Sequence, residues 1–284
     1  MALAPQLTPE RIASRALFNV DKFSCHGCMT FQSVIDIGGA ALLIDLIVVS
    51  LTILLGAGLG RLLKMDRDTA LLTSIGSSIC GAAAVLGAEP VVKSKPYKAA
   101  VAVSTVVIFG TLSMFLYPAL YRAGILNLTS EQMGLFTGAT LHEVAHVVGA
   151  GNAMGQAISD PAIIVKMIRV MMLAPVLVIL SIILARRDSA AGGNSEKRKI
   201  TIPWFAFLFL AVIGFNSLHL LPAELVDAIN TLDTFLLTMA MTALGAESSF
   251  EKFKKAGARP FLLAGLLYVW LFFGGYWLVK LISF

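Results

Sequence analysis

Charged residues are scarce in this chain of 284 residues, at 14% of the total, and cysteine occurs only three times. Because 57% of the residues are hydrophobic and the mean hydropathy is +0.84, the chain has more apolar surface than one soluble core can bury. Cys25 and Cys28 have the spacing of a thiol redox pair or of half a zinc site, but the third cysteine, Cys80, completes no second pair. The composition excludes a soluble globular protein, and we expect neither a metal nor a cofactor.

Apolar stretches long enough to cross about 30 Å of hydrocarbon recur along most of the chain. Eight are predicted, over residues 37–63, 69–92, 98–121, 132–155, 161–184, 202–221, 224–245 and 260–282. Residues 1–33 contain no apolar run of that length and are predicted to form a non-membrane tail rather than a signal peptide. The expected fold class is an all-α, multi-pass membrane protein.

The lysines and arginines of the loops predict which face of the membrane each loop occupies. If the eight segments alternate in direction, 13 of the 22 Lys and Arg residues fall on one face, 7 on the other and 2 inside a segment. The positive-inside rule places the more basic face in the cytoplasm and both termini outside. Lys93, Lys95 and Lys98 fall on the less basic face in this assignment. The pI near 9.2 follows from these loops, so we expect the lipid bilayer, and no nucleic acid, as a partner.

A short internal repeat indicates duplication. Leu86-Gly87-Ala88-Glu89 recurs 158 residues later as Leu244-Gly245-Ala246-Glu247, and each copy ends an apolar stretch and precedes a lysine-rich one. We expect a partial first repeat of three segments over 34–125 and a second repeat of five over 126–284. Matching segments are five crossings apart, so the two repeats have opposite orientations, and the first lacks two segments. The alternative is eight unrelated helices with a coincidental tetrapeptide.

Small and polar residues interrupt the predicted span 69–92 at residues 74–84. Glycines permit a helix to break, and the N-terminus of a half-helix carries partial positive charge that favours an anion. The counterpart at residues 231–245 carries hydroxyls and an acid at similar depth. We expect a small-anion site where the two interrupted helices meet, with substrate-binding residues Ser77, Ser78, Cys80, Gly81, Asp233 and Thr242. Ordinary packing of small residues is the alternative.

Ionisable residues inside predicted spans are costly in a bilayer and are usually paired or functional. Lys166 and Arg169 lie three apart on one helical face, and we expect them to offset the charge of a bound anion. His142 and Glu143 lie mid-segment and are the expected proton acceptors, if the coupling ion is a proton rather than sodium. Asp45 is a further candidate. In the alternative, Lys166 and Arg169 extend to the membrane interface and pair locally.

The stretch His142-Glu143-Val144-Ala145-His146 also matches the HExxH motif of zinc proteases. On a helix its two histidines share a face, and the glutamate would activate a zinc-bound water. The extended motif has a third histidine where this chain has Asn152, and no glutamate elsewhere stands in a recognisable ligand motif, including Glu224 and Glu247. A membrane metalloprotease therefore stays the rival interpretation.

Several segments together resemble the YeiH family of bacterial membrane proteins. They are Ser77-Ser78-Ile79-Cys80-Gly81, Glu89-Pro90-Val91-Val92-Lys93, the stretch 106–110 with Tyr117-Pro118, His142-Glu143-Val144-Ala145, and the stretches 166–175, 202–206 and 232–237. The resemblance covers residues 31–284. The family is classed with sulfate exporters, in a superfamily similar to bile acid, arsenite and riboflavin transporters.

The resemblance implies an inner-membrane transporter with an inverted repeat, crossed interrupted helices, and sulfate or a related oxyanion or sulfonate as substrate. Family members carry further helices at the N-terminus and usually glutamine at the position of His146. We therefore expect a secondary transporter without enzymatic activity that exports a small anion, from an N-terminally truncated chain. A transport-incompetent fragment stays an alternative, and the oligomeric state is not predicted.

Overall fold

The structure is a computed structural model that describes residues 39–190 and 257–282, with a few isolated positions between 222 and 239. The tail over 1–33, with Cys25 and Cys28, lies outside these residues. All regular structure within the described ranges is helical, which confirms the all-α prediction. The helices are α3 (Gly39–Leu62), α4 (Arg67–Ser78), α5 (Ala82–Val92), α6 (Pro96–Arg122), α7 (Ser130–Thr140), α8 (Val144–Met154), α9 (Gln156–Met171), α10 (Leu173–Ala190) and α14 (Ala258–Ile282).

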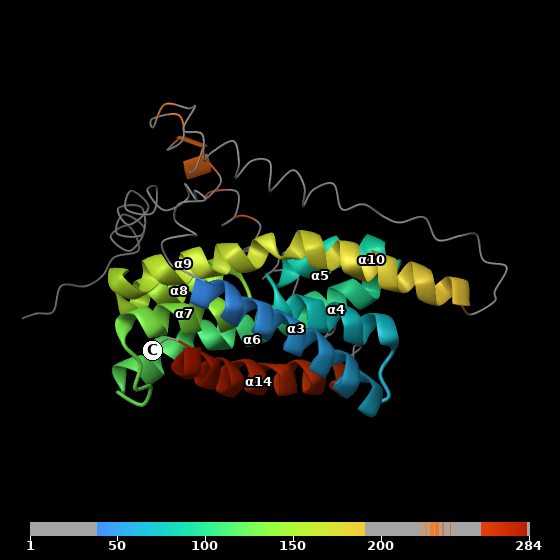
Figure 1. The fold of residues 1–284 in the computed structure, drawn as a ribbon, viewed down its shortest axis with the longest axis horizontal. Helices are drawn as coiled ribbons and strands as arrows, with labels where there is room; N and C mark the ends of the chain where they lie inside the picture. Colours follow the sequence, from blue (N-terminus) through green and yellow to red (C-terminus); the bar gives the residue numbers. More distant parts are fainter. Residues whose placement is uncertain are drawn as a thin grey trace, which may run out of the picture.

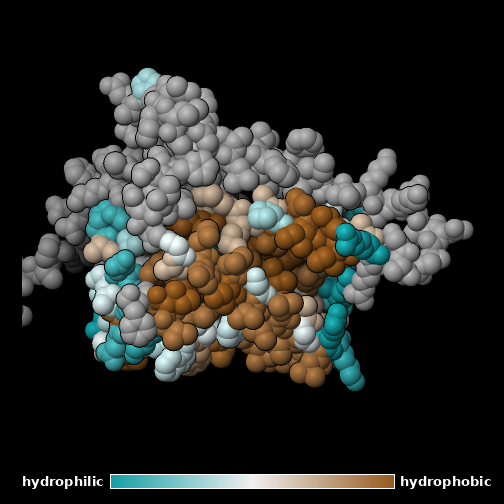
Figure 2. Space-filling view, viewed as in Figure 1, coloured by the Kyte–Doolittle hydropathy of each residue, from teal (hydrophilic) through white to brown (hydrophobic). Residues whose placement is uncertain are grey.

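Four helical stretches in the described residues are long and apolar enough to cross a membrane. They are Gly39–Leu62, Tyr97–Arg122, Gln156–Arg186, in which α10 continues α9, and Ala258–Ile282. These confirm the predicted spans 37–63, 98–121, 161–184 and 260–282. Their exposed apolar side chains form a brown band between polar ends (Figure 2), as a lipid-facing surface requires. The predicted span 202–221 lies outside the described residues, and the span 224–245 is described only at isolated positions.

The predicted span 69–92 does not cross the membrane but forms a helical hairpin, α4–α5. Asp66, the N-cap of α4, lies 2.6 Å from the ammonium of Lys98 in the first turn of α6. Helix α5 ends at Val92, shortly before α6 begins at Pro96, so α5 returns to the face from which α4 started (Figure 1). The two helices pack closely, because a Cβ on Gly76 would lie 2.6 Å from a methyl of Val85. The prediction of a single crossing here is wrong.

The predicted span 132–155 forms a second hairpin, α7–α8, which opens to the opposite face. The guanidinium of Arg122, at the end of α6, donates to the carbonyl of Ala153 at 2.6 Å, near the end of α8. Helix α7 begins after the short loop that follows Arg122, so both ends of the hairpin lie at that face (Figure 1). The prediction of a single crossing over 132–155 is therefore also wrong.

Local sequence explains where each hairpin begins. The carboxylate of Asp66 accepts a hydrogen bond from the backbone N–H of Thr69, which caps the first turn of α4. Thr129 and Gln132 form a reciprocal capping box at the start of α7. The first helix of each hairpin, α4 or α7, is therefore capped by a side chain at its membrane face. Neither α5 nor α8 is capped by the side chain of its own N-cap residue.

The two hairpins and the helix after each form an internal repeat with a shift of 62 residues. Helices α4 and α7 end at Ser78 and Thr140, and α5 and α8 begin at Ala82 and Val144. At the same shift, Gly76 corresponds to Gly138, and residues 85–88 correspond to residues 147–150, with three identities in four. Because the hairpins open to opposite faces, the two units are inverted relative to each other. The predicted repeat at 158 residues involves 244–247, outside the described residues.

The hairpin topology also changes which face of the membrane each lysine and arginine of the loops occupies. We call the face where α4 starts the basic face. It holds nine of the described Lys and Arg residues, namely Arg61, Lys64, Arg67, Lys93, Lys95, Lys98, Arg186, Arg187 and Arg259. The opposite face holds Arg122 and Lys280. The lysines at 93–98, predicted on the less basic face, therefore lie on the basic face, which the positive-inside rule places in the cytoplasm.

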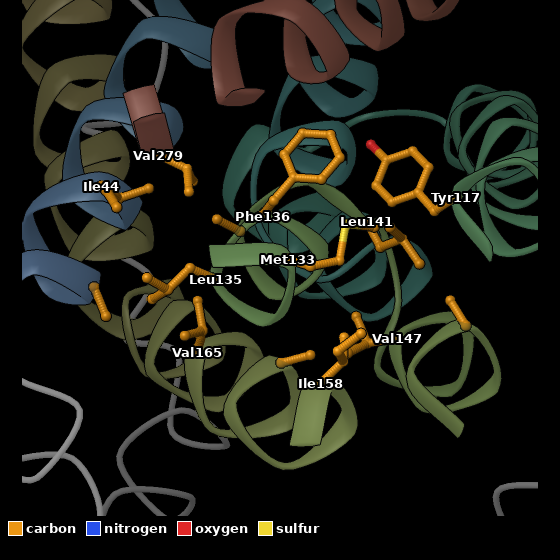
Figure 3. Packing of buried hydrophobic residues seen from close by; sticks show 14 of the residues in the cluster. Ile44, Tyr117, Met133, Leu135, Phe136, Leu141, Val147, Ile158, Val165 and Val279 are labelled. Carbon is orange, nitrogen blue, oxygen red and sulfur yellow. The ribbon is translucent and has the colours of Figure 1, made fainter. Parts of the chain in front are cut away.

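Apolar side chains around α7 hold the second hairpin against its neighbours (Figure 3). The rings of Tyr117 on α6 and Phe136 on α7 are stacked, with centroids 4.8 Å apart. The hydroxyl of Tyr117 and that of Thr140 are hydrogen-bonded at 3.0 Å, near the end of α7. This packing fixes α7 at half the depth of the spanning helices.

The hairpin topology is tested by labelling single cysteines in a background in which Cys25 and Cys28 are replaced by serine and buried Cys80 is kept. We predict that Lys64→Cys and Lys95→Cys react with a membrane-impermeant maleimide from one side, because both residues lie on the basic face. Asn127→Cys, in the loop after α6, reacts from the other side. Reaction of Lys95→Cys from the same side as Asn127→Cys would show that α4–α5 crosses the membrane.

Candidate substrate site at the meeting hairpin tips

The turns of the two hairpins meet in the middle of the helix bundle. We call residues 79–81 the first tip and residues 141–143 the second tip. The carboxylate of Glu143 in the second tip accepts a hydrogen bond at 3.2 Å from the N–H of Ala82, which follows the first tip. The ammonium of Lys166 on α9 bridges the carbonyls of Ile79 and His142, at 2.7 Å from each. Residues far apart in sequence thus form one polar centre at mid-depth.

Lys166 is fully buried and donates three hydrogen bonds, all at 2.7 Å, to the carbonyls of Ile79, Leu141 and His142. An ammonium has three N–H groups, so all of its donors are used. The carbonyls at the end of a helix have no partner within the helix, and they carry partial negative charge. Lys166 therefore satisfies the backbone at the ends of α4 and α7 together.

Arg169, one turn further along α9, repeats this arrangement with a planar group. Its Nε donates to the carbonyl of Ser78 at 2.7 Å and an Nη donates to that of Ser77 at 3.1 Å. The other Nη donates to the carbonyl of Ala139 at the end of α7. Both cationic side chains are fully buried, so the alternative in which they extend to the membrane interface is wrong.

Gly81 allows the two tips to approach each other. Its φ of +71° lies in the left-handed region, where a residue with a Cβ is strained. A Cβ at this position would also lie 2.4 Å from Cγ of Glu143. The carboxylate of Glu143, for which Gly81 leaves room, lies at the N-terminus of α5, where the helix dipole favours negative charge. The centre thus has cations at two helix C-termini and an anion at a helix N-terminus.

The HExxH stretch does not form the helical turn that zinc coordination requires. His142 and Glu143 precede α8, and Glu143 has an extended backbone with φ −118° and ψ 155°. Only His146 lies within the helix, so the two histidines do not share a helical face. Asn152, at the position of the third ligand, accepts a hydrogen bond from the hydroxyl of Ser159. The geometric premise of the metalloprotease interpretation is therefore wrong.

Several buried polar atoms on the residues of this centre have no hydrogen-bond partner in the described part of the chain. Buried polar groups are normally hydrogen-bonded, so a cluster of unpartnered ones marks a candidate binding site for a ligand, an ion or a proton. Asp45 on α3 is fully buried and interacts electrostatically with Arg169 and Lys166, and both of its carboxylate oxygens are unpartnered. The other such atoms are the hydroxyls of Ser77 and Thr137, the second carboxylate oxygen of Glu143, Nδ1 of His146, and both ring nitrogens of His142.

The structure brings together eight of the predicted site residues and leaves two outside the described ranges. Those brought together are Ser77, Ser78, Cys80, Gly81, His142, Glu143, Lys166 and Arg169. Asp233 and Thr242 lie outside. Sequence reasoning missed Thr137 and Leu141 in the second hairpin, although the 62-residue spacing of Gly76 and Gly138 was a signal for them.

Gly81→Ala is predicted to destabilise the protein, because the added methyl meets both an unfavourable φ and the side chain of Glu143. Gly124→Ala is the matched control, since Gly124 has a similar φ of +67° but open space where the Cβ would be. We expect Gly81→Ala to cost about 1–3 kcal/mol more than the control, the range for overpacking. Thermal unfolding in detergent measures the difference, and equal melting temperatures for the two variants would contradict close contact between the tips.

Comparison with known proteins identifies the family of this chain. The family model described as "Conserved hypothetical protein 698" matches residues 27–264. A UPF0324 membrane protein of Bacteroides thetaiotaomicron is 67% identical over 256 residues, which cover 90% of this chain and 76% of the relative. The UPF0324 inner membrane protein YeiH of Escherichia coli K12 is 51% identical over 249 residues, 87% of this chain and 70% of the relative. No solved structure matches.

These relatives are named as membrane proteins, which agrees with the apolar spans. The match to YeiH confirms the resemblance seen in the sequence. The chain therefore belongs to the UPF0324, or YeiH, family of integral membrane proteins.

Proposed function

We propose that this protein is a secondary transporter of the bacterial inner membrane that exports sulfate or a related small oxyanion. The observation that carries the proposal is the meeting of two half-depth hairpins, open to opposite faces, at a buried charged centre. Secondary transporters commonly bind substrate near mid-membrane, at the interface of inverted repeats whose helices are discontinuous there. A zinc enzyme is not supported, because the HExxH stretch is not helical at His142 and Glu143.

The centre offers an anion two kinds of favourable interaction. The N-termini of α5 and α8 lie at the two tips and carry partial positive charge. Lys166 and Arg169 add two positive charges, although the ammonium of Lys166 has no free N–H while it binds the three carbonyls. In this proposal the cations act on the anion through their field, and Ser77, whose hydroxyl is unpartnered, donates directly. Ser78 ends α4 next to Ser77, and Cys80 and Gly81 follow in the first tip.

Alternating access follows from the arrangement of the hairpins. Helices α4–α5 separate the centre from the basic face, and α7–α8 separate it from the opposite face. Displacement of one hairpin would expose the centre to one side only. Lys98 binds both Asp66 and Asp68, at 2.6 and 2.7 Å, and so ties α6 to the start of α4 at the basic face. We propose that this ion pair holds the first hairpin closed.

The coupling ion is also part of the proposal. Glu143 and His142 are buried at the second tip and are the proposed proton acceptors, and the unpartnered oxygens of Asp45 provide the alternative site for sodium. Asp233 and Thr242, outside the described residues, stay predicted substrate contacts.

Transport is tested with the purified chain in proteoliposomes, by exchange of internal sulfate for external radiolabelled sulfate. We expect exchange above that of protein-free vesicles. Arg169→Lys should reduce it at least about tenfold, because a compact ammonium cannot reproduce the planar guanidinium that donates to the carbonyls of Ser77, Ser78 and Ala139, and a charge-assisted hydrogen bond contributes about 1.5–3 kcal/mol.

Arg61→Lys, a substitution of the same type at the exposed end of α3, is the control and should retain exchange within a factor of about two. Absence of exchange in the unmodified chain would reject the transporter proposal. Equal exchange by Arg169→Lys and Arg61→Lys would reject the role given to the centre.

A further inference from the structure

The carboxyl group of Glu143 lies beside the imidazole of His146, three residues further along the chain. Oε2 of Glu143 lies 3.8 Å from Nδ1 of His146, and the two residues are only 2% and 7% exposed. Neither of these two atoms has a hydrogen-bond partner in the described part of the chain. The remaining polar atoms of both groups are engaged, since Oε1 of Glu143 accepts from Ala82 and Nε2 of His146 lies 3.4 Å from the hydroxyl of Thr111.

Two glycines on different helical elements make room for this pair. A Cβ on Gly110 of α6 would lie 2.5 Å from Nδ1 of His146, and a Cβ on Gly81 would lie 2.4 Å from Cγ of Glu143. Each glycine therefore faces one member of the pair. The imidazole and the carboxyl group fit beside each other only because both neighbouring positions lack a side chain.

The chemistry of the two facing atoms indicates what is missing between them. When the N–H of the neutral imidazole is on Nε2, where it donates to the hydroxyl of Thr111, Nδ1 is an acceptor. An ionised carboxylate oxygen is also an acceptor, so in this tautomer neither facing atom satisfies the other. One proton between them converts the contact into a hydrogen bond and removes one buried negative charge. We propose that Glu143 and His146 bind a single proton between them and that, if the protein transports anions as proposed above, this proton is the coupling ion.

Several other ionisable groups face the pair. Lys166 on α9 interacts electrostatically with both members of the pair, Cys80 with Glu143, and His142 with His146. Arg169 on α9 and Asp45 on α3 interact in turn with Lys166. Thr111, on α6, contributes only a hydroxyl to the contact. In this proposal the charges of these surrounding groups stay the same when the pair gains or loses its proton. The pair therefore changes the net charge of the centre by one.

This change in charge couples the proton to the anion. Without the proton the pair is negative and repels an anion at the tips, and with the proton it is neutral. Anion and proton therefore favour each other's binding reciprocally and are carried in the same direction, so export coupled in this way is driven by the outward gradient of the anion. The proton comes from water at one face, forms an O–H or N–H bond within the pair, and leaves to water at the other face when that bond breaks. Because Glu143 also binds Ala82, the proton lies where the two hairpins touch.

Infrared difference spectroscopy of the chain in lipid, without substrate, tests the proton site over a series of pH values. We expect a protonated-carboxyl band that disappears in Glu143→Gln. In His146→Gln its titration midpoint should fall by about one pH unit, because the amide N–H stabilises the ionised carboxylate. His142→Gln tests the other imidazole of the second tip, which the proposed function names as a proton acceptor. If Glu143 pairs with His146 instead, this variant should leave the midpoint within a few tenths of a unit. A midpoint that moves in His142→Gln but not in His146→Gln would overturn the pairing, as would a band that persists in Glu143→Gln.

A second measurement separates this inference from the proposed function. Proteoliposomes with an internal pH dye report whether sulfate movement is accompanied by proton movement, which Glu143→Gln should abolish. A titrating Glu143 band in a chain that moves no sulfate would reject the transporter but support the proton site. Sulfate movement with the same proton movement in Glu143→Gln and in the unmodified chain would reject the proton site while transport stands.

Discussion

The hydrogen bonds from Lys166 and Arg169 to backbone carbonyls are the constraint on which the rest of the structure depends. Six such bonds join one helix, α9, to the C-terminal ends of both α4 and α7. Backbone groups at membrane depth cannot be satisfied by lipid, so a hairpin that stops halfway needs internal partners for its last carbonyls. Two cations one turn apart supply them for both hairpins together, and this explains why charges that are costly in a bilayer are fully buried here.

That constraint also determines the electrostatics of the centre. Each hairpin contributes one helix C-terminus, which carries partial negative charge, and one helix N-terminus, which carries partial positive charge. The C-termini of α4 and α7 bind the cations. The N-terminus of α5 binds the carboxylate of Glu143 through the N–H of Ala82. Rearrangement of either hairpin must exchange these partners. An inverted pair of units with one shared set of cations is a suitable basis for two states that open to different faces.

Sequence reasoning predicted the class, the four long spans and the location of the polar centre, because composition and buried charge are local properties. Ser77, Gly81, Lys166 and Arg169 were recognisable as unusual for lipid-facing helix. It did not predict the hairpins, since a stretch of about 24 apolar residues has the same hydropathy whether it crosses or turns back halfway. The turn depends on contacts from α9, 87–92 residues away in sequence for the first hairpin. The error in topology also placed three lysines on the wrong face.

An experimental density map of the chain in a lipid environment would show whether Lys166 joins the two hairpins. We predict continuous density for Lys166 that ends between the carbonyls of Ile79 and His142, with both hairpins turning back at that depth. Density showing either hairpin continuing as one helix to the far face, or Lys166 directed away from both tips, would contradict it.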